Sequence, residues 1–233
     1  MKILDAPHYR QAGGSDCQAA CAAMMMDYWT RRGDGGSEER LKALFEEFAF
    51  SFVPTEGDCP AITGLVALTI AGKGFTVDFY SKNPDGGGTQ GLAFLRKGDW
   101  NWPDSEIERY ASHAQQILVN PPNNDVTTHN RCMTSQEIEQ AINAGQPVVV
   151  VVDRGVLQRI GKGPNHVYLI TGIDADRIYV NDPAKESGLD EYDRESFLNA
   201  HRQDSTDHDA YVIRRRSCWR TCTAWLRRRL RTK

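Results

Sequence analysis

A cysteine, a histidine and an aspartate in this sequence are placed so that they could together carry out nucleophilic catalysis. The first is Cys17, which follows a glycine-containing loop and opens a segment rich in Ala, Met and Gln. That composition, free of Pro and Gly, predicts a helix that ends at about Trp29 or Arg31. Ser15 or Asp16 is the expected N-cap, so Cys17 falls in the first helical turn.

The start of a helix is a place where a cysteine can be activated. Its first turn has unpaired backbone N–H groups and the positive end of the helix dipole, and both stabilise a thiolate relative to a thiol. Because the thiolate is the nucleophile, Cys17 is a candidate reactive sulfur. On this segment alone, the simpler interpretation of Cys17 is a small buried hydrophobic side chain that begins a helix.

A second segment, far downstream, reads as a β-hairpin that His166 enters and Asp182 leaves. If the turn consists of the three residues 174–176, Ile173 pairs with Arg177. His166 and Asp182 are then diagonal neighbours on one face of the hairpin, within about 7–8 Å of each other. A turn of two residues would place them on opposite faces.

In the three-residue register, His166 would accept the proton of the Cys17 thiol, and Asp182 would hold the imidazole in the required tautomer. Gln11 lies in the loop six residues before Cys17. Its side-chain amide could join the Cys17 backbone N–H in an oxyanion hole. Each residue alone is more simply a strand-end histidine, a turn aspartate or a loop glutamine, whereas together they indicate a catalytic site.

The elements that must position these residues follow from the periodicity of the apolar side chains. Further helices are predicted at 37–50, 63–74, 104–117 and 134–145, and strands at 75–80, 147–152, 167–173, 177–181 and 211–213. Residues 118–131 contain paired Pro and Asn residues and are predicted to be irregular. Helices that precede strands indicate an α+β domain, in which an N-terminal helical part carries Cys17 and a C-terminal antiparallel sheet carries His166 and Asp182.

The overall composition excludes several other classes of protein. Of the 233 residues, 40% are hydrophobic and 25% charged, as in an ordinary soluble globular protein. No apolar run approaches the roughly 18 residues that span a bilayer, and we expect no signal peptide after Met1. The six cysteines lack the spacing of metal ligands. We therefore expect a cytoplasmic protein with reduced thiols, no metal and no cofactor.

The net charge of −3 is unevenly distributed along the chain. Nine of the 28 basic residues lie from Arg214 onward, which leaves 19 basic against 31 acidic residues in the rest. We expect one domain over residues 1–213 and a basic amphipathic tail over residues 214–233. The tail could contact an anionic membrane or an acidic partner, or be a solvated terminus. Nucleic acid is not an expected partner, because the rest of the chain is acidic.

These segments resemble the papain-like cysteine peptidases of the C39-like group, which includes the bacteriocin-leader peptidases. The resemblance rests on Gln11 before Cys17, on the run 137–147, and above all on His166-Val-x-Leu-Ile-Thr-Gly-Ile-Asp followed by Ile-Tyr-Val-Asn-Asp182-Pro. It implies a papain-like fold with Cys17 as nucleophile and His166 as general base. It also implies Asp182 as the orienting residue and Gln11 as an oxyanion donor.

Two features depart from that group, and three functions remain open. Gln18 stands where members usually carry Gly, and residues 83–131 have no counterpart in the resemblance. The chain could hydrolyse peptide or isopeptide bonds of a peptide or protein substrate through an acyl-enzyme. It could instead be an acyl or γ-glutamyl transferase with the same triad, in which an amine replaces water. It could also be a non-catalytic peptide-binding module.

Overall fold

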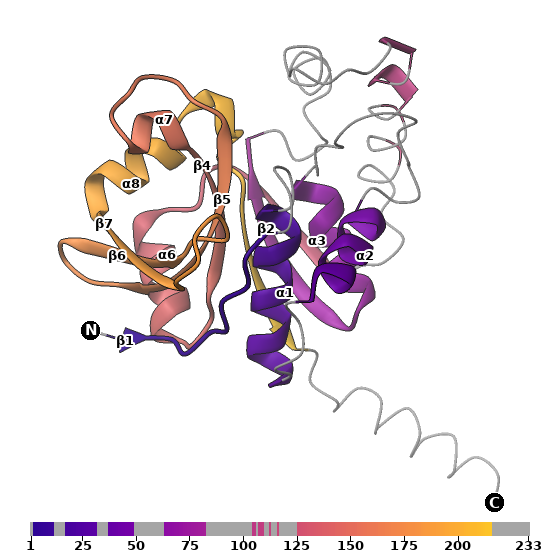
Figure 1. Ribbon diagram of the computed structural model, residues 1–233, viewed down its shortest axis with the longest axis horizontal. Coiled ribbons are helices and arrows are strands. Elements are labelled where there is room, and N and C mark those ends of the chain that lie inside the picture. Colours follow the sequence, from indigo (N-terminus) through magenta and orange to yellow (C-terminus); the bar gives the residue numbers. More distant parts are fainter. Residues whose placement is uncertain are drawn as a thin grey trace, which may run out of the picture.

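The computed structural model describes residues 2–11, 17–31, 37–48, 63–82, 104–105, 107–109, 112, 116 and 125–215. Within these ranges a single sheet forms the centre, and helices cover both of its faces (Figure 1). The predicted N-cap at Ser15 or Asp16, most of the predicted helix 104–117 and the predicted tail beyond Arg215 lie outside the described residues.

The sheet mixes strands from both halves of the chain. Its described strands are β1 (Lys2–Ile3), β2 (Phe75–Ser81), β3 (Val126–Asn130), β4 (Val148–Asp153), β5 (Asn165–Ile173), β6 (Arg177–Asn181), β7 (Leu189–Asp193) and β8 (Ala210–Arg215). They run in the order β3-β2-β8-β4-β5-β6-β7, with β1 beside β5. β2 and β3 are parallel, whereas the other pairs are antiparallel. The predicted α+β class is confirmed, and the sheet extends beyond the C-terminal strands expected.

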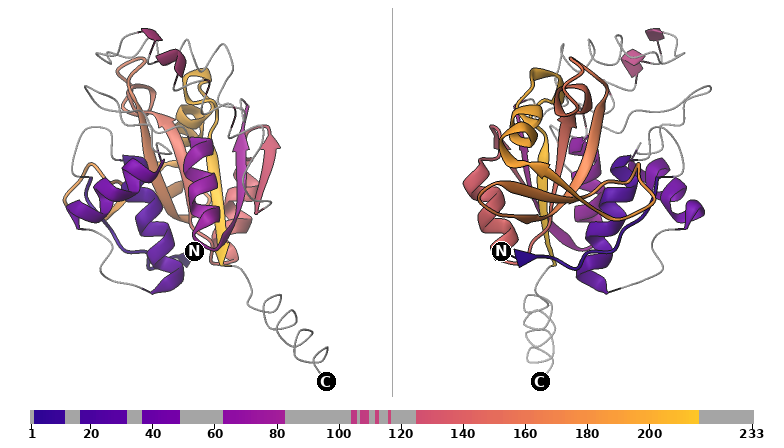
Figure 2. Two further views of the ribbon diagram at one scale, coloured as in Figure 1. Left: turned by 90° about the vertical axis from the view of Figure 1, so that its right-hand side faces the viewer. Right: turned by 60° about the vertical axis from the view of Figure 1, so that its left-hand side comes forward.

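Helices form a layer on each face of the sheet (Figures 1 and 2). The described helices are α1 (Cys17–Thr30), α2 (Glu38–Phe48), α3 (Thr63–Gly72), α6 (Ser135–Asn143), α7 (Arg154–Leu157) and α8 (Arg194–His201), with a short 3₁₀ turn η1 (Asp204–Thr206). α1 and α3 share one apolar cluster with the sheet, and α6 and α8 share a second. The α6 N-terminus has the capping box expected at Thr134.

β4 shows why the core lies on both faces. All residues of Val148–Asp153 are buried. Side chains alternate between faces in a strand, so Val149 and Val151 join the cluster of α1. Val148, Val150 and Val152 join the cluster of α6 and α8. A strand covered on both faces is expected to read as an unbroken apolar run, and the strand predicted at 147–152 is confirmed.

α1 is enclosed along most of its length. Its residues from Gln18 to Asp27 are all buried. The Cys21 thiol lies 3.5 Å from the carbonyl oxygen of Val167 in β5. The buried Asp27 carboxylate accepts two hydrogen bonds of 2.8 Å from Arg40 in α2. A helix buried on every side is held by packing rather than by an amphipathic pattern, and it has a fixed place against β5.

One predicted irregular segment contains a strand. Val126–Asn130 forms β3, although residues 118–131 were expected to lack regular structure. β3 lies parallel to β2, so its hydrogen-bonding partner is more than 40 residues away in the chain. Local Pro and Asn signals predict breaks in structure, but they carry no information about a distant strand that offers a free edge.

The turn between β5 and β6 comprises residues 174–176 as predicted, but the strand pairing next to it is shifted by one residue. Ile173 pairs with Ile178 instead of Arg177. The cause is Asp174, whose carboxylate accepts the backbone N–H groups of Asp176 at 3.0 Å and Arg177 at 2.8 Å. The Arg177 N–H thus bonds to the Asp174 side chain, while the Arg177 carbonyl oxygen accepts the Asp174 N–H at 3.0 Å. The slip alone would move His166 and Asp182 to opposite faces.

A β-bulge in β5 restores the expected register. The pairing shifts between Ile170 and Gly172, which leaves Thr171 as the extra residue. Beyond the bulge, Leu169 pairs with Asn181. The next residue, Asp182, therefore falls opposite Tyr168, as the three-residue turn had required. Two compensating irregularities give the register that one regular turn was expected to give.

The sequence analysis missed β7, α7 and α8. Aspartate side chains cap both helices: Asp153 accepts from the Val156 N–H at 3.1 Å, and Asp193 accepts from the Ser196 N–H at 2.8 Å. Aspartate before such a segment is an N-cap signal that was available in the sequence. β8 also takes in Arg214 and Arg215, the first residues of the predicted tail.

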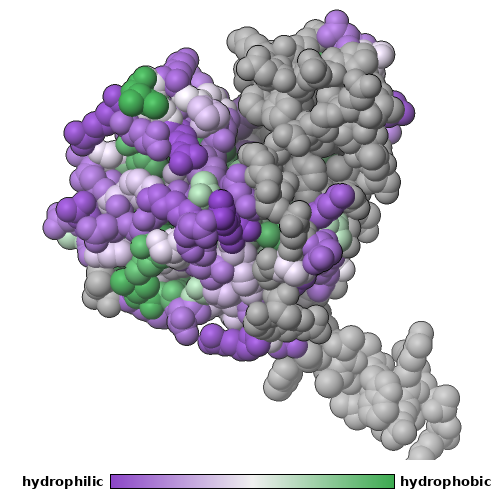
Figure 3. All heavy atoms as spheres, viewed as in Figure 1, coloured by the Kyte–Doolittle hydropathy of each residue, from purple (hydrophilic) through white to green (hydrophobic). Residues whose placement is uncertain are grey.

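The surface drawn in Figure 3 is mainly hydrophilic, with small and separate apolar patches among the described residues. Within the described part of the chain, the exposed large apolar side chains are those of Ile3, Ile160 and Leu189. None of the described helices is both long enough and apolar enough to cross a membrane.

Asp209, which precedes β8, carries a carboxyl group inside the fold. The residue is half-buried, but its Oδ1 oxygen is shielded from solvent. Burial raises the pKa of Asp209 to about 7, and hydrogen bonds from Ser81 and Thr63 only partly oppose this rise. The folded chain therefore holds this proton at a pH where the unfolded chain has lost it.

This difference predicts how stability depends on pH. A carboxyl whose pKa is raised by folding contributes stability below the unfolded value, and that contribution is lost as the pH rises through about 7. We expect Asp209→Asn to remove this part of the pH dependence, so that the variant loses less unfolding free energy than the wild type between pH 5 and pH 8. Urea denaturation at each pH measures the unfolding free energy. Asp5→Asn, at an exposed position, is the control and should follow the wild type; identical pH profiles for all three chains would contradict the prediction.

Candidate active site

Cys17 is the first residue of α1, as expected from the sequence. It is partly buried and packs against the apolar cluster that α1 shares with the sheet. Its backbone N–H is among those at the open end of the helix, where the dipole favours a negative charge. The sulfur therefore lies where α1 meets β5.

His166 is the residue that joins the other members of the site. It is the second residue of β5 and is only 6% exposed. Its Nε2 lies 2.7 Å from Oδ1 of Asp182. Cys17 lies close enough to the same ring to raise its pKa, and since Nε2 is used by Asp182, Nδ1 is the nitrogen that can face the sulfur. The structure thus brings Cys17, His166 and Asp182 together.

The charges of these groups depend on one another. Burial lowers the pKa of His166, but hydrogen bonds to Asp182 and Cys17 outweigh it and bring the pKa to about 9. Burial likewise opposes ionisation of Asp182, yet the His166 hydrogen bond and the backbone N–H of Ala184 hold its pKa below the usual value. The Ala184 N–H donates to Asp182 at 2.9 Å. A protonated His166 beside an ionised Asp182 carboxylate is therefore the favoured state at neutral pH.

Gln11, the fourth predicted residue, lies beside the same turn. It is half-buried, and its backbone N–H donates to the Pro183 carbonyl oxygen at 2.8 Å. This bond places Gln11 next to the residue that follows Asp182. A helix that begins at Cys17 and lies against a sheet that carries His166 and Asp182 is the papain-like arrangement that the resemblance implied.

The other described cysteines differ from Cys17 in their surroundings. Cys21 has no exposed surface. Its burial raises the pKa of its thiol well above the usual value, and the charges of Cys17 and Asp182 add to this rise. Burial also raises the pKa of Cys132. Among the described cysteines, Cys17 is the one that raises the pKa of His166.

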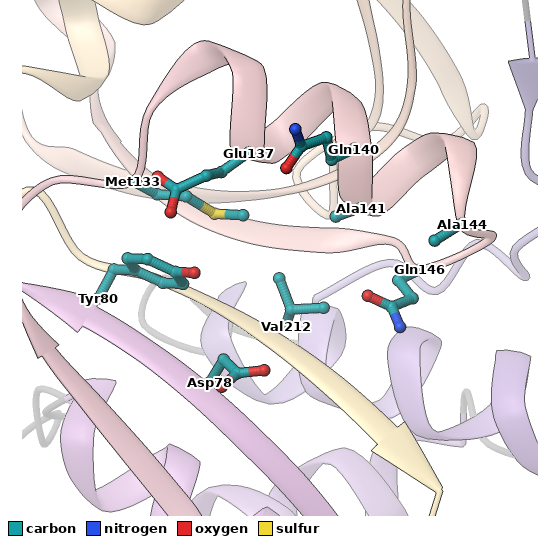
Figure 4. A pocket seen from close by; sticks show the side chains of 9 residues that line it. All are labelled: Asp78, Tyr80, Met133, Glu137, Gln140, Ala141, Ala144, Gln146 and Val212. Atoms are coloured by element: carbon teal, nitrogen blue, oxygen red, sulfur yellow. The ribbon is translucent and has the colours of Figure 1, made fainter.

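A cavity of about 310 Å³ lies elsewhere, between α6 and the β2–β8 pair (Figure 4). It is lined by Asp78, Tyr80, Met133, Glu137, Gln140, Ala141, Ala144, Gln146 and Val212. Its carboxylates already have partners, because Asp78 pairs with Arg214 and Glu137 with Arg131. None of the predicted site residues lines this cavity. Within the described ranges, no group of three His, Cys, Asp or Glu side chains is arranged to hold a metal ion.

Two supporting groups were missed from the sequence. The Ala184 N–H is the second donor to Asp182, and an Asp-Pro sequence at the end of a strand is a signal for such a turn. Tyr168 meets the His166 ring edge-on, with 4.7 Å between ring centroids. Its place follows from the two-residue period of the strand, but its contact depends on the fold.

The electrostatic argument predicts the effect of Asp182→Asn on His166. Loss of the carboxylate charge leaves burial as the largest influence, so the pKa of His166 should fall below the wild-type value of about 9. The imidazole signals can be followed by NMR from pH 5 to pH 10. His201, whose pKa burial lowers to about 4, is an internal control that should not change. An unchanged His166 titration would contradict the assigned hydrogen bond.

Comparison with known proteins identifies the family. Among curated proteins, none matches this chain. A crystal structure from Bacillus anthracis, of a protein assigned as a C39-like peptidase, aligns over 93% of this chain and 99% of its own, with 15% identity and a TM-score of 0.44. The model of the Peptidase C39 like family matches residues 3–207. The chain therefore belongs to the C39-like peptidase family.

Proposed function

We propose that this chain is a cysteine peptidase, which hydrolyses peptide or isopeptide bonds through an acyl-enzyme. The observation that carries the proposal is that His166 is hydrogen-bonded to the Asp182 carboxylate at 2.7 Å, and that Cys17 lies close enough to raise the pKa of the same ring. Thiol, imidazole and carboxylate in this order correspond to the nucleophile, base and orienting group of a triad. Membership of a peptidase family supports the same reaction class.

In this proposal the resting site holds a thiolate and an imidazolium. With a pKa of about 9, His166 keeps its second proton at neutral pH, and the Asp182 carboxylate beside it is ionised. The start of α1 supplies backbone N–H groups and a helix dipole that stabilise the Cys17 thiolate. Asp182, held by Ala184, keeps the ring oriented with Nδ1 toward the sulfur.

The reaction then proceeds in two halves. The Cys17 thiolate attacks the carbonyl carbon of the substrate, and the Gln11 amide and the Cys17 N–H are assigned to the oxyanion that forms. As the intermediate collapses, the C–N bond breaks, His166 protonates the leaving amine, and a thioester remains. His166 next takes a proton from water, the hydroxide attacks the thioester, and the acid product leaves with the thiolate restored.

The proposed substrate is a peptide or a protein, and the partners of the basic tail also stay proposals. The half-buried Gln11 and the partly buried Cys17 mark where the scissile carbonyl would lie. An anionic membrane or an acidic protein is the partner class that the arginines beyond Arg215 would suit. The cytoplasmic location remains a prediction from the sequence.

The proposed roles predict the effects of three substitutions. Cys17→Ala and His166→Ala should each lower turnover by about a thousandfold or more, because each removes a group that takes part in bond making. Asp182→Asn should have a smaller effect, because the imidazole is still present but less well oriented. Cleavage of a proteome-derived peptide library, followed by mass spectrometry, measures the losses, and circular dichroism checks that each variant folds. Full activity of Cys17→Ala would show that the mechanism is wrong.

A second prediction tests the thiolate–imidazolium pair without a substrate. Iodoacetamide should alkylate Cys17 well below the free-thiol pKa of about 8.5, and His166→Ala should abolish this reactivity at low pH. Mass spectrometry identifies the labelled cysteine, and the buried Cys21 is the internal control that should stay unlabelled until the chain is denatured. If Cys17 reacts with the same pH dependence as in the denatured chain, the chain is a non-catalytic module and the proposed function fails.

A further inference from the structure

The segment of residues 4–11 carries Gln11 to the site without any helix or strand of its own. Figure 1 shows it, in indigo, running from β1 toward the start of α1. At its beginning the Leu4 N–H donates at 2.8 Å to the carbonyl oxygen of Thr171, the bulged residue of β5. Since an irregular segment has no ladder to fix its register, the position of Gln11 must come from such contacts.

The end of β6 supplies the next contacts. Asn181 is only 4% exposed, and its side-chain amide donates to two carbonyl oxygens of the segment. The acceptors are Pro7 at 3.0 Å and Ala6 at 3.2 Å. A buried amide that uses both N–H bonds on successive carbonyls fixes the register of the segment against β6.

His8 makes the contact that reaches the triad. Its Nε2 lies 2.9 Å from the backbone carbonyl oxygen of Asp182, so this nitrogen carries the proton and donates it. The ring lies against Gly188, where an added Cβ would come within 2.9 Å of Cβ and 3.2 Å of Cγ of His8. Glycine at position 188 therefore leaves the space in which the His8 side chain packs.

The turn after β6 thus contacts both sides of the site. The Asp182 carboxylate faces inward to His166, while its carbonyl oxygen faces the segment and accepts from His8. One residue further, the Pro183 carbonyl oxygen accepts from the Gln11 N–H. We infer that His8 is a positioning residue that, with Asn181, sets where Gln11 lies relative to the Cys17–His166 pair.

The inference rests on the proposed function, since Gln11 has a catalytic task only there. It has a specific consequence, because His8 acts through the oxyanion donor and not through the thiolate. Alkylation by iodoacetamide requires the thiolate but develops no oxyanion, whereas attack on an ester requires both. A change at His8 should therefore separate the two reactions.

The test uses the full chain with p-nitrophenyl acetate and iodoacetamide, both at pH 7. In acylation the Cys17 thiolate attacks the ester carbonyl, p-nitrophenolate leaves, and its absorbance reports the rate. We expect His8→Ala to slow acylation about tenfold, as a shift of the donor by a fraction of an ångström would, with alkylation unchanged. His8→Gln, which keeps an N–H donor, should restore most of the rate.

A double-mutant cycle assigns the effect to Gln11. In the Gln11→Ala background, His8→Ala should change acylation by less than about twofold, because the group it positions is already gone. Gly188→Ala is a second variant that displaces the His8 ring without removing it, and it should mimic His8→Ala. Arg10→Ala is the matched control, because the neighbouring Arg10–Glu186 ion pair is exposed and contributes little.

The outcomes separate two kinds of failure. If His8→Ala slows acylation and alkylation equally, or if its effect multiplies with that of Gln11→Ala, His8 is only structural and the inference is wrong. If the wild-type Cys17 reacts with either reagent no faster than in the denatured chain, the proposed function itself is overturned, and the inference with it.

Discussion

The 2.7 Å contact between His166 and Asp182 exists only in one register of β5 against β6, and the rest of the site depends on that register. Side chains alternate along a strand, so a slip of one residue would turn either side chain away. The turn at Asp174 introduces such a slip, and the bulge at Thr171 reverses it. The bulged residue then offers its carbonyl to Leu4 and so begins the segment that carries Gln11.

Because the site is buried, the loss of any hydrogen bond within it would cost more free energy than the same loss at the surface. Asp182 has almost no exposed surface, and an unpaired carboxylate there would carry a large desolvation cost. Its Oδ1 oxygen receives both His166 and the Ala184 N–H, so the charge is compensated on the side of the ring and on the side of the turn. The enclosed α1, with Cys21 against Val167, keeps the sulfur at a fixed distance from β5. The pair is therefore preorganised by packing, not by the flexible reach of its side chains.

Local sequence patterns predicted the elements whose formation depends mainly on interactions between residues close together in the chain. The helix that begins at Cys17, the capping box at Thr134 and the valine strand at 148–152 were found because propensity, capping and burial agree there. β3 was missed because its stability comes from β2, which is distant in sequence. The candidate triad was found by assuming a regular turn, and no local pattern shows that a bulge at Thr171 compensates the shifted pairing at that turn. The contacts of the segment 4–11 are also nonlocal, so His8 could not be distinguished from any loop histidine.

Two buried histidines show why residue type alone does not define such a site. His201 is buried at 1% exposure, donates through Nδ1 to the Val151 carbonyl at 2.8 Å, and lies near His208. No anion offsets its desolvation, so its pKa falls to about 4 and the ring is neutral at pH 7. His166 is also buried, but Asp182 and Cys17 raise its pKa by more than burial lowers it, so that the pKa reaches about 9. The difference lies in the partners that the fold supplies, and for His166 those partners are set by strand register and by the start of one helix.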